Sequence, residues 1–201
     1  VNILGGGESG VGAAVLAKVK NLDVCVYDRD KIKQPFKDIL GQYKIAFKEE
    51  QNIDELKEAD IIVKSPGIPD DQKIVKQLRE KKKKIISEVE FAAQFTDSFV
   101  IAITGTNGKT TTSKLIGHIL QKAGKSVSIA GNIGNSFAFE IATSPKPYYV
   151  VEVSSFQLDN IENFKPNIAI ITDITADHLD RYQHRLEKYV QAKLKITQNQ
   201  D

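Results

Sequence analysis

Cysteine and long apolar runs are the two features that this sequence most clearly lacks. The one cysteine, Cys25, can form no disulfide within the chain, and in the run DVCVY it is most simply a small apolar strand residue. The apolar stretches extend over only a few residues, far fewer than the ~20 that a membrane-spanning helix needs. The first residues also lack the charged and then apolar pattern of a signal peptide. We therefore expect a cytoplasmic protein without redox chemistry and without a membrane partner.

An excess of one charge is also absent. The 28 Lys and Arg residues nearly balance the 26 Asp and Glu residues. Nucleic-acid binding needs a clustered basic surface, so we expect no nucleic-acid partner. The basic run 81–84 closes a predicted helix at 71–83, where cations favour the negative end of the helix dipole, and it indicates a solvated helix end. With 41% apolar residues, the chain can form one large or two small globular domains.

Short β-rich runs alternate with longer helical patterns along the chain. The runs are almost continuously apolar, as is typical of strands that are buried on both faces of a parallel sheet. They lie at 1–4, 23–27, 60–64, 84–87, 99–104, 126–130, 148–154 and 167–172. Glycine-rich turns at 5–12 and 105–110 each start a new series of strands and helices. The pattern predicts an α/β protein with two domains: a Rossmann-like parallel-sheet domain at 1–93, and a P-loop ATPase-type α/β domain at 94–201.

The segment GGGESG places Gly5, Gly7 and Gly10 in the spacing G-x-G-x-x-G, between a predicted strand and a predicted helix. Glycines at such a turn let the backbone approach a phosphate at the amino terminus of the helix. Asp28 follows the next strand, where a carboxylate can accept hydrogen bonds from sugar hydroxyl groups. The motif by itself is compatible with an NAD-type ligand, with another nucleotide, or with a turn that only packs against its helix.

The segment AITGTNGKTTT at 102–112 is more specific. A strand ends, a glycine-rich loop turns, and Lys109 and Thr110 begin a helix. In such a loop the backbone amides bind phosphates, the lysine neutralises the terminal phosphates, and the threonine hydroxyl can bind Mg²⁺. The spacing departs from G-x-x-x-x-G-K-[ST], because Ile103 stands where the first glycine is expected and Gly105 follows two residues later. The segment predicts an ATP site.

Five segments together resemble the Mur ligases, which join an amino acid to a carboxylate through an acyl phosphate. They are GTNGKTTT at 105–112, GNIG at 131–134, EVSSFQLD at 152–159, DITADHLDRY at 173–182 and AKLKI at 192–196. The resemblance extends over essentially the whole chain and is closest to the members that add D-glutamate to UDP-N-acetylmuramoyl-L-alanine. It implies that the first domain holds UDP rather than NAD, with the segment SPGI at 65–68 against the uracil.

The resemblance also implies which residues form the sites. ATP would contact Gly105, Thr106, Asn107, Gly108, Lys109, Thr110 and Thr111. The UDP-linked substrate would contact Gly7, Glu8, Ser9, Asp28, Arg29, Ser65, Pro66, Gly67, Asn132, Ser154, Gln157 and His178. The catalytic residues would be Lys109, Glu152, His178 and Lys193, and the Mg²⁺ ligands would be Thr110, Glu152, His178 and a carbamylated Lys193.

Without the family resemblance, the local sequence pattern gives several of these residues a purely structural role. His178 would be a loop or cap residue, because Mg²⁺ prefers oxygen ligands. Lys193 would lie on the solvated face of a helix at 185–197. Ser155 would cap the following helix, and neither Ser154 nor Ser155 has a base at a spacing that indicates a serine nucleophile.

The resemblance implies a chain that continues beyond this sequence, through the rest of the central domain and into a C-terminal domain that binds D-glutamate. We therefore expect the 201 residues to be inactive in isolation and monomeric. Two alternatives remain at this stage. One is an NAD-dependent oxidoreductase based on GGGESG and Asp28, which gives no role to GTNGKT, and the other is a nucleotide-binding module without catalysis.

Overall fold

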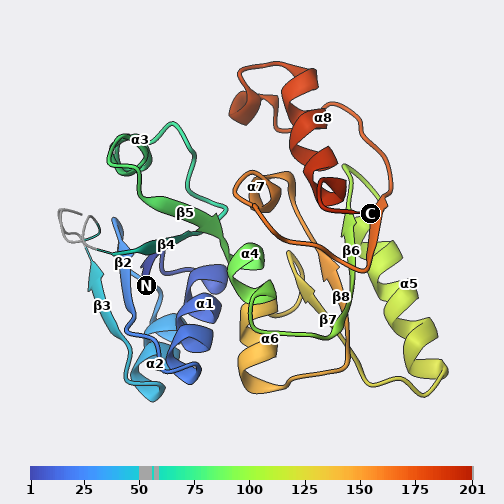
Figure 1. Cartoon of the computed structure of the whole chain (residues 1–201), viewed down its shortest axis with the longest axis horizontal. Coiled ribbons are helices and arrows are strands. Elements are labelled where there is room, and N and C mark those ends of the chain that lie inside the picture. Colours follow the sequence, from blue (N-terminus) through green and yellow to red (C-terminus); the bar gives the residue numbers. More distant parts are fainter. Residues whose placement is uncertain (50–55, 57–58, 201) are drawn as a thin grey trace.

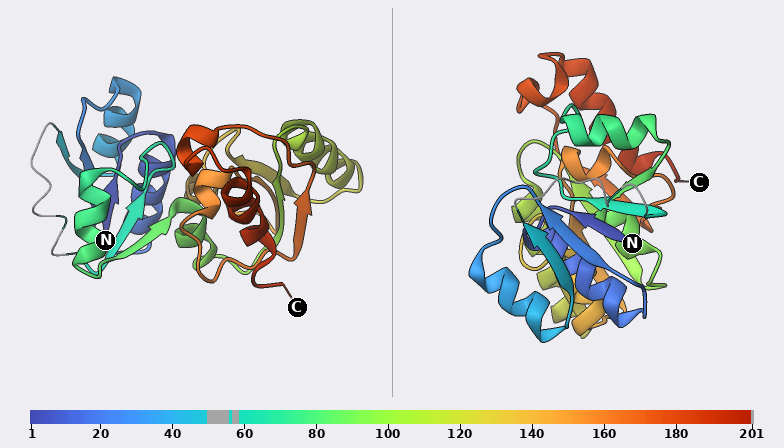
Figure 2. Two further views of the ribbon diagram at one scale, coloured as in Figure 1. Left: turned by 90° about the horizontal axis from the view of Figure 1, so that it is seen from above. Right: turned by 90° about the vertical axis from the view of Figure 1, so that its left-hand side faces the viewer.

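The computed structural model describes residues 1–49, 56 and 59–200. Its strands form two parallel sheets, which occupy separate halves of the molecule in Figures 1 and 2. The first sheet has the order β3-β2-β1-β4-β5, with bounds Asn2–Leu4 (β1), Cys25–Asp28 (β2), Ala46–Glu49 (β3), Ile61–Lys64 (β4) and Lys84–Ser87 (β5). The second has the order β7-β8-β6-β9, with bounds Phe99–Thr104 (β6), Val127–Gly131 (β7), Tyr148–Glu152 (β8) and Ile168–Ile171 (β9).

Helices connect these strands and cover the sheets. Those of the first half are Glu8–Val19 (α1), Gln34–Gln42 (α2), Lys73–Glu80 (α3) and Glu88–Ala93 (α4). Those of the second half are Lys109–Lys122 (α5), Phe137–Thr143 (α6), Ser155–Leu158 (α7) and Leu186–Leu194 (α8), with short 3₁₀ turns at Leu179–Tyr182 (η2) and Lys195–Thr197 (η3). The α/β fold class that the sequence predicts is confirmed, and each apolar run overlaps a strand.

Strand β3 is the described strand that no apolar run in the sequence predicts. Its residues AFKE mix apolar and charged side chains, and Ala46 and Phe47 are exposed. The strand pairs only with β2 among the described strands, at the edge of the first sheet. An edge strand needs no continuous apolar run, because one of its sides faces away from the sheet.

The two halves share a continuous apolar core. Helix α1 packs against α6 and α4, and buried side chains such as Val15, Phe91 and Phe137 belong to one cluster that spans both halves. The helices approach closely at Gly12, where an added Cβ atom would lie 1.9 Å from the Ser136 Oγ atom. This core joins the two halves of the molecule. Each half contains a parallel sheet, and open α/β folds bind their ligands at the carboxyl ends of such strands.

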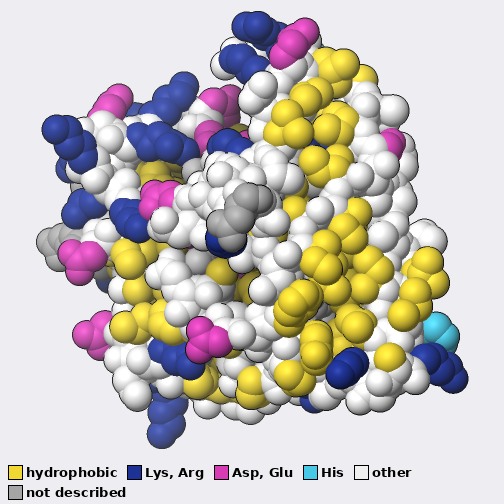
Figure 3. All heavy atoms as spheres, turned by 45° about the vertical axis from the view of Figure 1, so that its right-hand side comes forward, with side chains coloured by type: hydrophobic (Ala, Val, Ile, Leu, Met, Phe, Trp, Pro, Cys, Tyr) yellow, Lys and Arg dark blue, Asp and Glu magenta, His cyan; other side chains and the backbone are white. Residues whose placement is uncertain are grey.

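The outer surface carries apolar side chains on the side of α5 and β9. Leu115 and Ile119 of α5 and Ile168 of β9 are among the exposed large apolar residues. Figure 3 shows apolar atoms gathered on this side of the molecule. Within the described ranges, every helix is too short or too polar to span a membrane.

Candidate functional site

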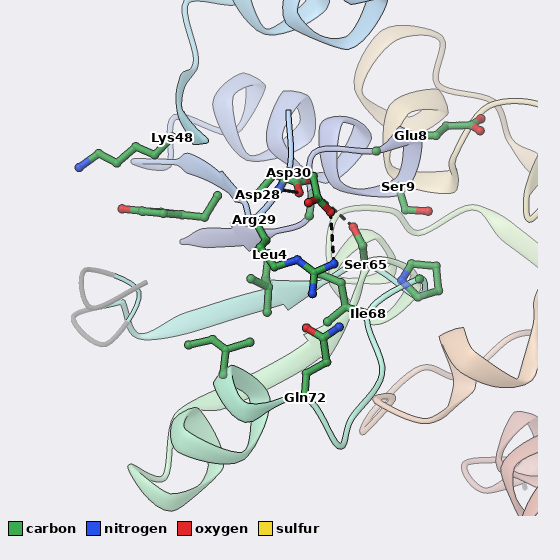
Figure 4. Close-up of a pocket in the computed structure, with 16 residues that line it drawn as sticks. Leu4, Glu8, Ser9, Asp28, Arg29, Asp30, Lys48, Ser65, Ile68 and Gln72 are labelled. Carbon is green, nitrogen blue, oxygen red and sulfur yellow. Dashed lines mark hydrogen bonds and ion pairs between the residues drawn. The ribbon is translucent and has the colours of Figure 1, made fainter. Parts of the chain in front are cut away.

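A cavity of about 390 Å³ lies at the carboxyl end of the first sheet (Figure 4). Leu4, Tyr27, Ile68 and Ile74 supply apolar surface to it. Its complete lining is Leu4, Gly5, Gly7, Glu8, Ser9, Tyr27, Asp28, Arg29, Asp30, Lys48, Ser65, Pro66, Gly67, Ile68, Gln72 and Ile74. A mainly apolar hollow with a few polar groups is the usual form of a small-molecule site.

The glycine loop that follows β1 forms one wall of this cavity. Gly5 has a φ of +104°, and an added Cβ atom would lie 2.7 Å from the Ser65 Oγ atom. An added Cβ atom on Gly10 would lie 1.8 Å from the Gly5 carbonyl oxygen. Glycine is therefore required here for the tight turn and for the approach of α1 to the loop. The same turn leaves the amino terminus of α1 at the cavity.

The Asp28 carboxylate holds this loop in place. Its Oδ2 atom accepts a hydrogen bond from the Gly6 amide at 2.7 Å, and its Oδ1 atom accepts one from the Asp30 amide at 2.9 Å. Asp28 lines the cavity, but both of its oxygens already bind backbone amides. A hydroxyl group of a ligand would have to use the remaining lone pairs of these oxygens.

The predicted substrate residues fall into two groups. Those near the first sheet all line the cavity: Gly7, Glu8, Ser9, Asp28, Arg29, Ser65, Pro66 and Gly67. The others belong to the second half: Asn132, Ser154, Gln157 and His178. Gln72 and Lys48 also line the cavity, and no sequence motif marks either residue. Figure 4 shows the polar ends of Arg29 and Gln72 turned toward each other.

The phosphate loop lies at the carboxyl end of β6. Gly105 and Gly108 have φ values of +152° and +80°, and Lys109 begins α5. The Lys109 Nζ atom turns back into the loop and donates to the carbonyl oxygens of Gly105 and Thr106 at 2.9 and 2.8 Å. Thr111 is exposed on the first turn of α5. A glycine-rich turn followed by the amino terminus of a 14-residue helix is a favourable site for an anion.

Two residues outside the predicted set hold this loop. The Asp173 Oδ1 atom accepts a hydrogen bond from the Asn107 amide at 2.6 Å, and this bond is the main cause that lowers the Asp173 pKa. The Tyr189 hydroxyl lies 3.1 Å from the Thr106 Oγ1 atom. Both residues come from segments more than 60 positions away, and so no local spacing could indicate them.

Glu152 lies at the end of β8 and is 1% exposed. Its Oε2 atom accepts from the Thr110 hydroxyl at 2.8 Å, and its Oε1 atom accepts from the Asn132 side-chain amide at 2.9 Å. Both of these donors are neutral. Burying a carboxylate is costly unless a positive charge or hydrogen bonds compensate for the lost water. The carboxylate and hydroxyl oxygens of this pair are ligands that suit Mg²⁺.

Lys193 is buried rather than solvated, contrary to what its helix pattern alone predicts. Its side chain in α8 is 2% exposed, and the Nζ atom donates to the Gly105 carbonyl at 2.7 Å. The Nζ atom also lies 4.6 Å from the centre of the Tyr189 ring. Burial, together with the nearby cation of Lys109, lowers the pKa of Lys193 to about 8. The two lysines therefore meet at one carbonyl of the phosphate loop.

His178 precedes η2 and has a left-handed backbone conformation, with φ of +49°. Its ring lies 5.3 Å from the Phe156 ring, and its Nε2 atom lies 3.5 Å from an Asp177 carboxylate oxygen. In the part of the chain that the structure describes, no three or more His, Cys, Asp and Glu side chains are grouped to hold a metal ion. Thr110 and Glu152 are thus the two predicted metal ligands that the fold joins directly.

Ser154 and Gln157 form a capping box at the start of α7. The Ser154 Oγ atom accepts from the Gln157 amide at 3.3 Å, and the Gln157 Oε1 atom accepts from the Ser154 amide at 2.9 Å. The cap is therefore Ser154, and not Ser155 as the sequence analysis expects. Such a box stabilises the helix start without any ligand.

The chain is similar to known proteins over nearly all of its length. Residues 103–201 match the Mur ligase middle domain. The chain is 53% identical over 199 residues to the UDP-N-acetylmuramoylalanine–D-glutamate ligase of Bacteroides fragilis, and 40% identical over 205 residues to that of Salinibacter ruber. These alignments include 98% of this chain but only 45% and 44% of the relatives, so the chain spans less than half of their length.

Solved structures share the fold at lower identity. A UDP-N-acetylmuramate:L-alanyl-gamma-D-glutamyl-meso-diaminopimelate ligase from Neisseria meningitides matches with a TM-score of 0.65 and 21% identity, over 98% of this chain and 67% of that chain. A UDP-N-acetylmuramate-alanine ligase from Thermotoga maritima matches with a TM-score of 0.61 and 23% identity, over 98% of this chain and 46% of that chain. At these identities the likeness shows a common fold.

Proposed function

We propose, because this chain belongs to the Mur ligase family, that it supplies the nucleotide-sugar site and the phosphate loop of an ATP-dependent ligase. The reaction would add D-glutamate to UDP-N-acetylmuramoyl-L-alanine during the synthesis of peptidoglycan precursors. The observation that carries the proposal is the pairing of Thr110 in a phosphate loop with the buried Glu152, in a chain that is 53% identical to such a ligase.

The two halves would have different roles. Residues 1–93 would form the domain that binds the UDP part of the substrate, and residues 94–201 would form part of the ATP-binding domain. The cavity supports the first assignment, because it combines apolar surface for a base with a helix amino terminus for phosphates. The phosphate loop supports the second.

The chemistry would consist of two transfers. An oxygen of the alanyl carboxylate attacks the γ-phosphorus of ATP and ADP leaves, which gives an acyl phosphate. The amine of D-glutamate then attacks the acyl carbon, inorganic phosphate leaves, and the amine loses a proton. Phosphoryl transfer of this kind depends mainly on positioning and on charge neutralisation. Lys109 would turn from the loop carbonyls toward the terminal phosphates.

Mg²⁺ would be held by Thr110 and Glu152 on the evidence of their paired oxygens. The ion would neutralise negative charge on the phosphates. Asn132 would orient the Glu152 carboxylate through its hydrogen bond. His178 would contact the substrate and a second metal ion; its ring lies 5.3 Å from the Phe156 ring.

Lys193 would act as a carbamate. The neutral amine adds to CO₂ and releases a proton, which replaces a buried ammonium with a carboxylate-like group. A pKa of about 8 leaves more of this amine neutral near pH 7 than the usual lysine value does. The carbamate would add an oxygen ligand close to the phosphate loop and would end the repulsion between Lys193 and Lys109.

The proposal is tested by thermal denaturation of the 201-residue chain in the presence of UDP, ATP with Mg²⁺, or NAD. A ligand that binds the folded state raises its stability by RT ln(1 + [L]/Kd). We expect UDP and Mg·ATP each to raise the melting temperature in a concentration-dependent way. Stabilisation by NAD alone would instead support a dinucleotide-dependent oxidoreductase and would contradict the proposal.

A further inference from the structure

The segment SPGI that forms one wall of the cavity is a tight turn. The Ile68 amide donates to the Ser65 carbonyl at 3.1 Å, which leaves Pro66 and Gly67 as the two central residues. Proline at the first central position is typical of such turns. The peptide plane between Pro66 and Gly67 is the one that differs between the common turn types, and glycine tolerates both orientations.

This peptide plane is held from the other half of the molecule. The Arg181 Nη2 atom of η2 donates to the Pro66 carbonyl at 3.2 Å, across 115 positions of sequence. The turn is attached to its own half at other points, since the Ser65 amide donates to the Leu4 carbonyl at 2.9 Å and the Lys64 Nζ atom donates to the Ile68 carbonyl at 2.7 Å. The bond from Arg181 therefore fixes the central peptide of a turn whose ends are already fixed.

Arg181 also shares an aromatic contact with His178. The guanidinium carbon of Arg181 lies 4.3 Å from the centre of the Phe156 ring, and the His178 ring lies 5.3 Å from the same centre. The Arg181 amide donates to the His178 carbonyl at 3.0 Å. Arg181 is thus connected to His178 in two ways, through the Phe156 ring and through a backbone hydrogen bond.

We propose that Arg181 is a positioning residue that couples occupancy of the first-sheet cavity to the turn that carries His178. The inference rests on the proposed nucleotide site. A nucleotide base against the SPGI turn would select the orientation of the Pro66–Gly67 peptide in which the Pro66 carbonyl accepts the hydrogen bond from Arg181. The cavity and the His178 turn would then bind their ligands cooperatively, through a discrete contact between the two halves.

The test uses UDP alone, which has no sugar-peptide part that could reach the second half. UDP affinity is measured by calorimetry, and the His178 ring is observed by NMR during the same titration. The chain has three histidines, so the His178 signal is assigned with a His178→Asn variant, and His118 on α5 is an internal reference. In the unmodified chain we expect UDP to shift the His178 signal with the same Kd that calorimetry gives.

Arg181→Gln removes the guanidinium but keeps a polar side chain of moderate length. We expect it to weaken UDP binding about threefold to tenfold, as for the loss of one ordinary hydrogen bond, and to abolish the His178 shift. Arg181→Lys keeps a cation near the Phe156 ring and should recover part of both effects. The matched control is Arg185→Gln, since Arg185 is exposed and pairs with Glu187 rather than with the first half.

The possible results distinguish failure of the coupling from failure of the nucleotide site. If Arg181→Gln binds UDP as tightly as the unmodified chain, or if the His178 shift is missing in the unmodified chain or persists in the variant, the coupling is refuted while the nucleotide site stands. If the unmodified chain does not bind UDP, both the nucleotide site and the coupling are refuted. Equal effects of Arg181→Gln and Arg185→Gln would also refute the specific role of Arg181.

Discussion

At the scale of single residues, the buried Glu88 carboxyl gives the clearest pH dependence. Glu88 is 1% exposed at the start of α4; its Oε1 atom accepts from the Ala138 amide at 2.5 Å, and its Oε2 atom has no partner among the described residues. Burial raises its pKa to about 7. The folded state therefore binds this proton more tightly than the unfolded state, and the contribution of Glu88 to stability falls as pH rises from about 4.5 to about 7.

We expect the Glu88→Gln variant to lose this pH dependence, because its amide cannot ionise. The raised pKa of Glu88 means that ionising this carboxyl at pH 8 costs the folded, unmodified protein about 3 kcal/mol. The measurement is urea denaturation at pH 5 and pH 8, in which the stability difference between the two pH values should shrink in the variant. Glu187→Gln on the exposed part of α8 is the control, and an identical pH profile for unmodified chain and Glu88→Gln would contradict the assignment.

Lys193 gives a second prediction at this scale. In ¹³C-labelled bicarbonate, we expect a carbamate carbon signal that grows as pH rises toward 8, because only the neutral amine reacts. The Lys193→Arg variant should lack this signal, while Lys188→Arg, which changes a partly exposed lysine of the same helix, should retain it. If the signal is the same in all three proteins, Lys193 does not form a carbamate.

At the scale of elements, the α1–α6 contact predicts the effect of a single methyl group. Ser136 caps α6 by accepting from the Phe139 amide at 3.3 Å, and a Cβ atom on Gly12 would overlap its hydroxyl. We expect Gly12→Ala to destabilise the fold by about 2 kcal/mol, through overpacking and the loss of the cap. The measurement is the urea midpoint at constant m-value.

Gly41→Ala is the matched control, because Gly41 also lies in a helix and an added Cβ atom there meets nothing within 4 Å. Replacing a helical glycine with alanine in open space stabilises by up to ~1 kcal/mol. If Gly12→Ala lowers the free energy of unfolding and Gly41→Ala raises it, then the closeness of α1 and α6, rather than helix propensity, decides the result at Gly12. A neutral Gly12→Ala would show that α6 can move away at little cost.

At the scale of the whole molecule, we expect the 201-residue chain to bind ligands without catalysing the complete reaction. The 201 residues correspond to 45% of the length of the Bacteroides fragilis relative, and none of the site residues assigned above is proposed to hold D-glutamate. We expect the chain to bind UDP but to release no phosphate that depends on D-glutamate, when it is given ATP, Mg²⁺ and UDP-N-acetylmuramoyl-L-alanine. Amine attack needs a reactant held at near-attack distance. D-glutamate-dependent phosphate release by this chain would overturn the expectation.

The sequence by itself determined the two glycine turns, of which the second is the phosphate loop, and the strands of both sheets with the exception of β3. These features depend on local spacing: apolar runs form buried parallel strands, and glycines occur where φ is positive or where a helix approaches closely. Gly5, Gly10, Gly105 and Gly108 could therefore be found from the pattern. The lining of the cavity by residues 65–67 followed from the family resemblance.

Only the tertiary structure decided what the polar side chains contact. Lys193 lies on a helix whose pattern predicts a solvated lysine, but α8 packs across the phosphate loop and buries it against the Gly105 carbonyl, 88 positions away. Two other hydrogen bonds likewise join distant segments: one from Arg181 to the Pro66 carbonyl, and one from the Ala138 amide to Glu88. Periodicity describes which face of an element is apolar, and it carries no information about which distant carbonyl or amide that face will meet.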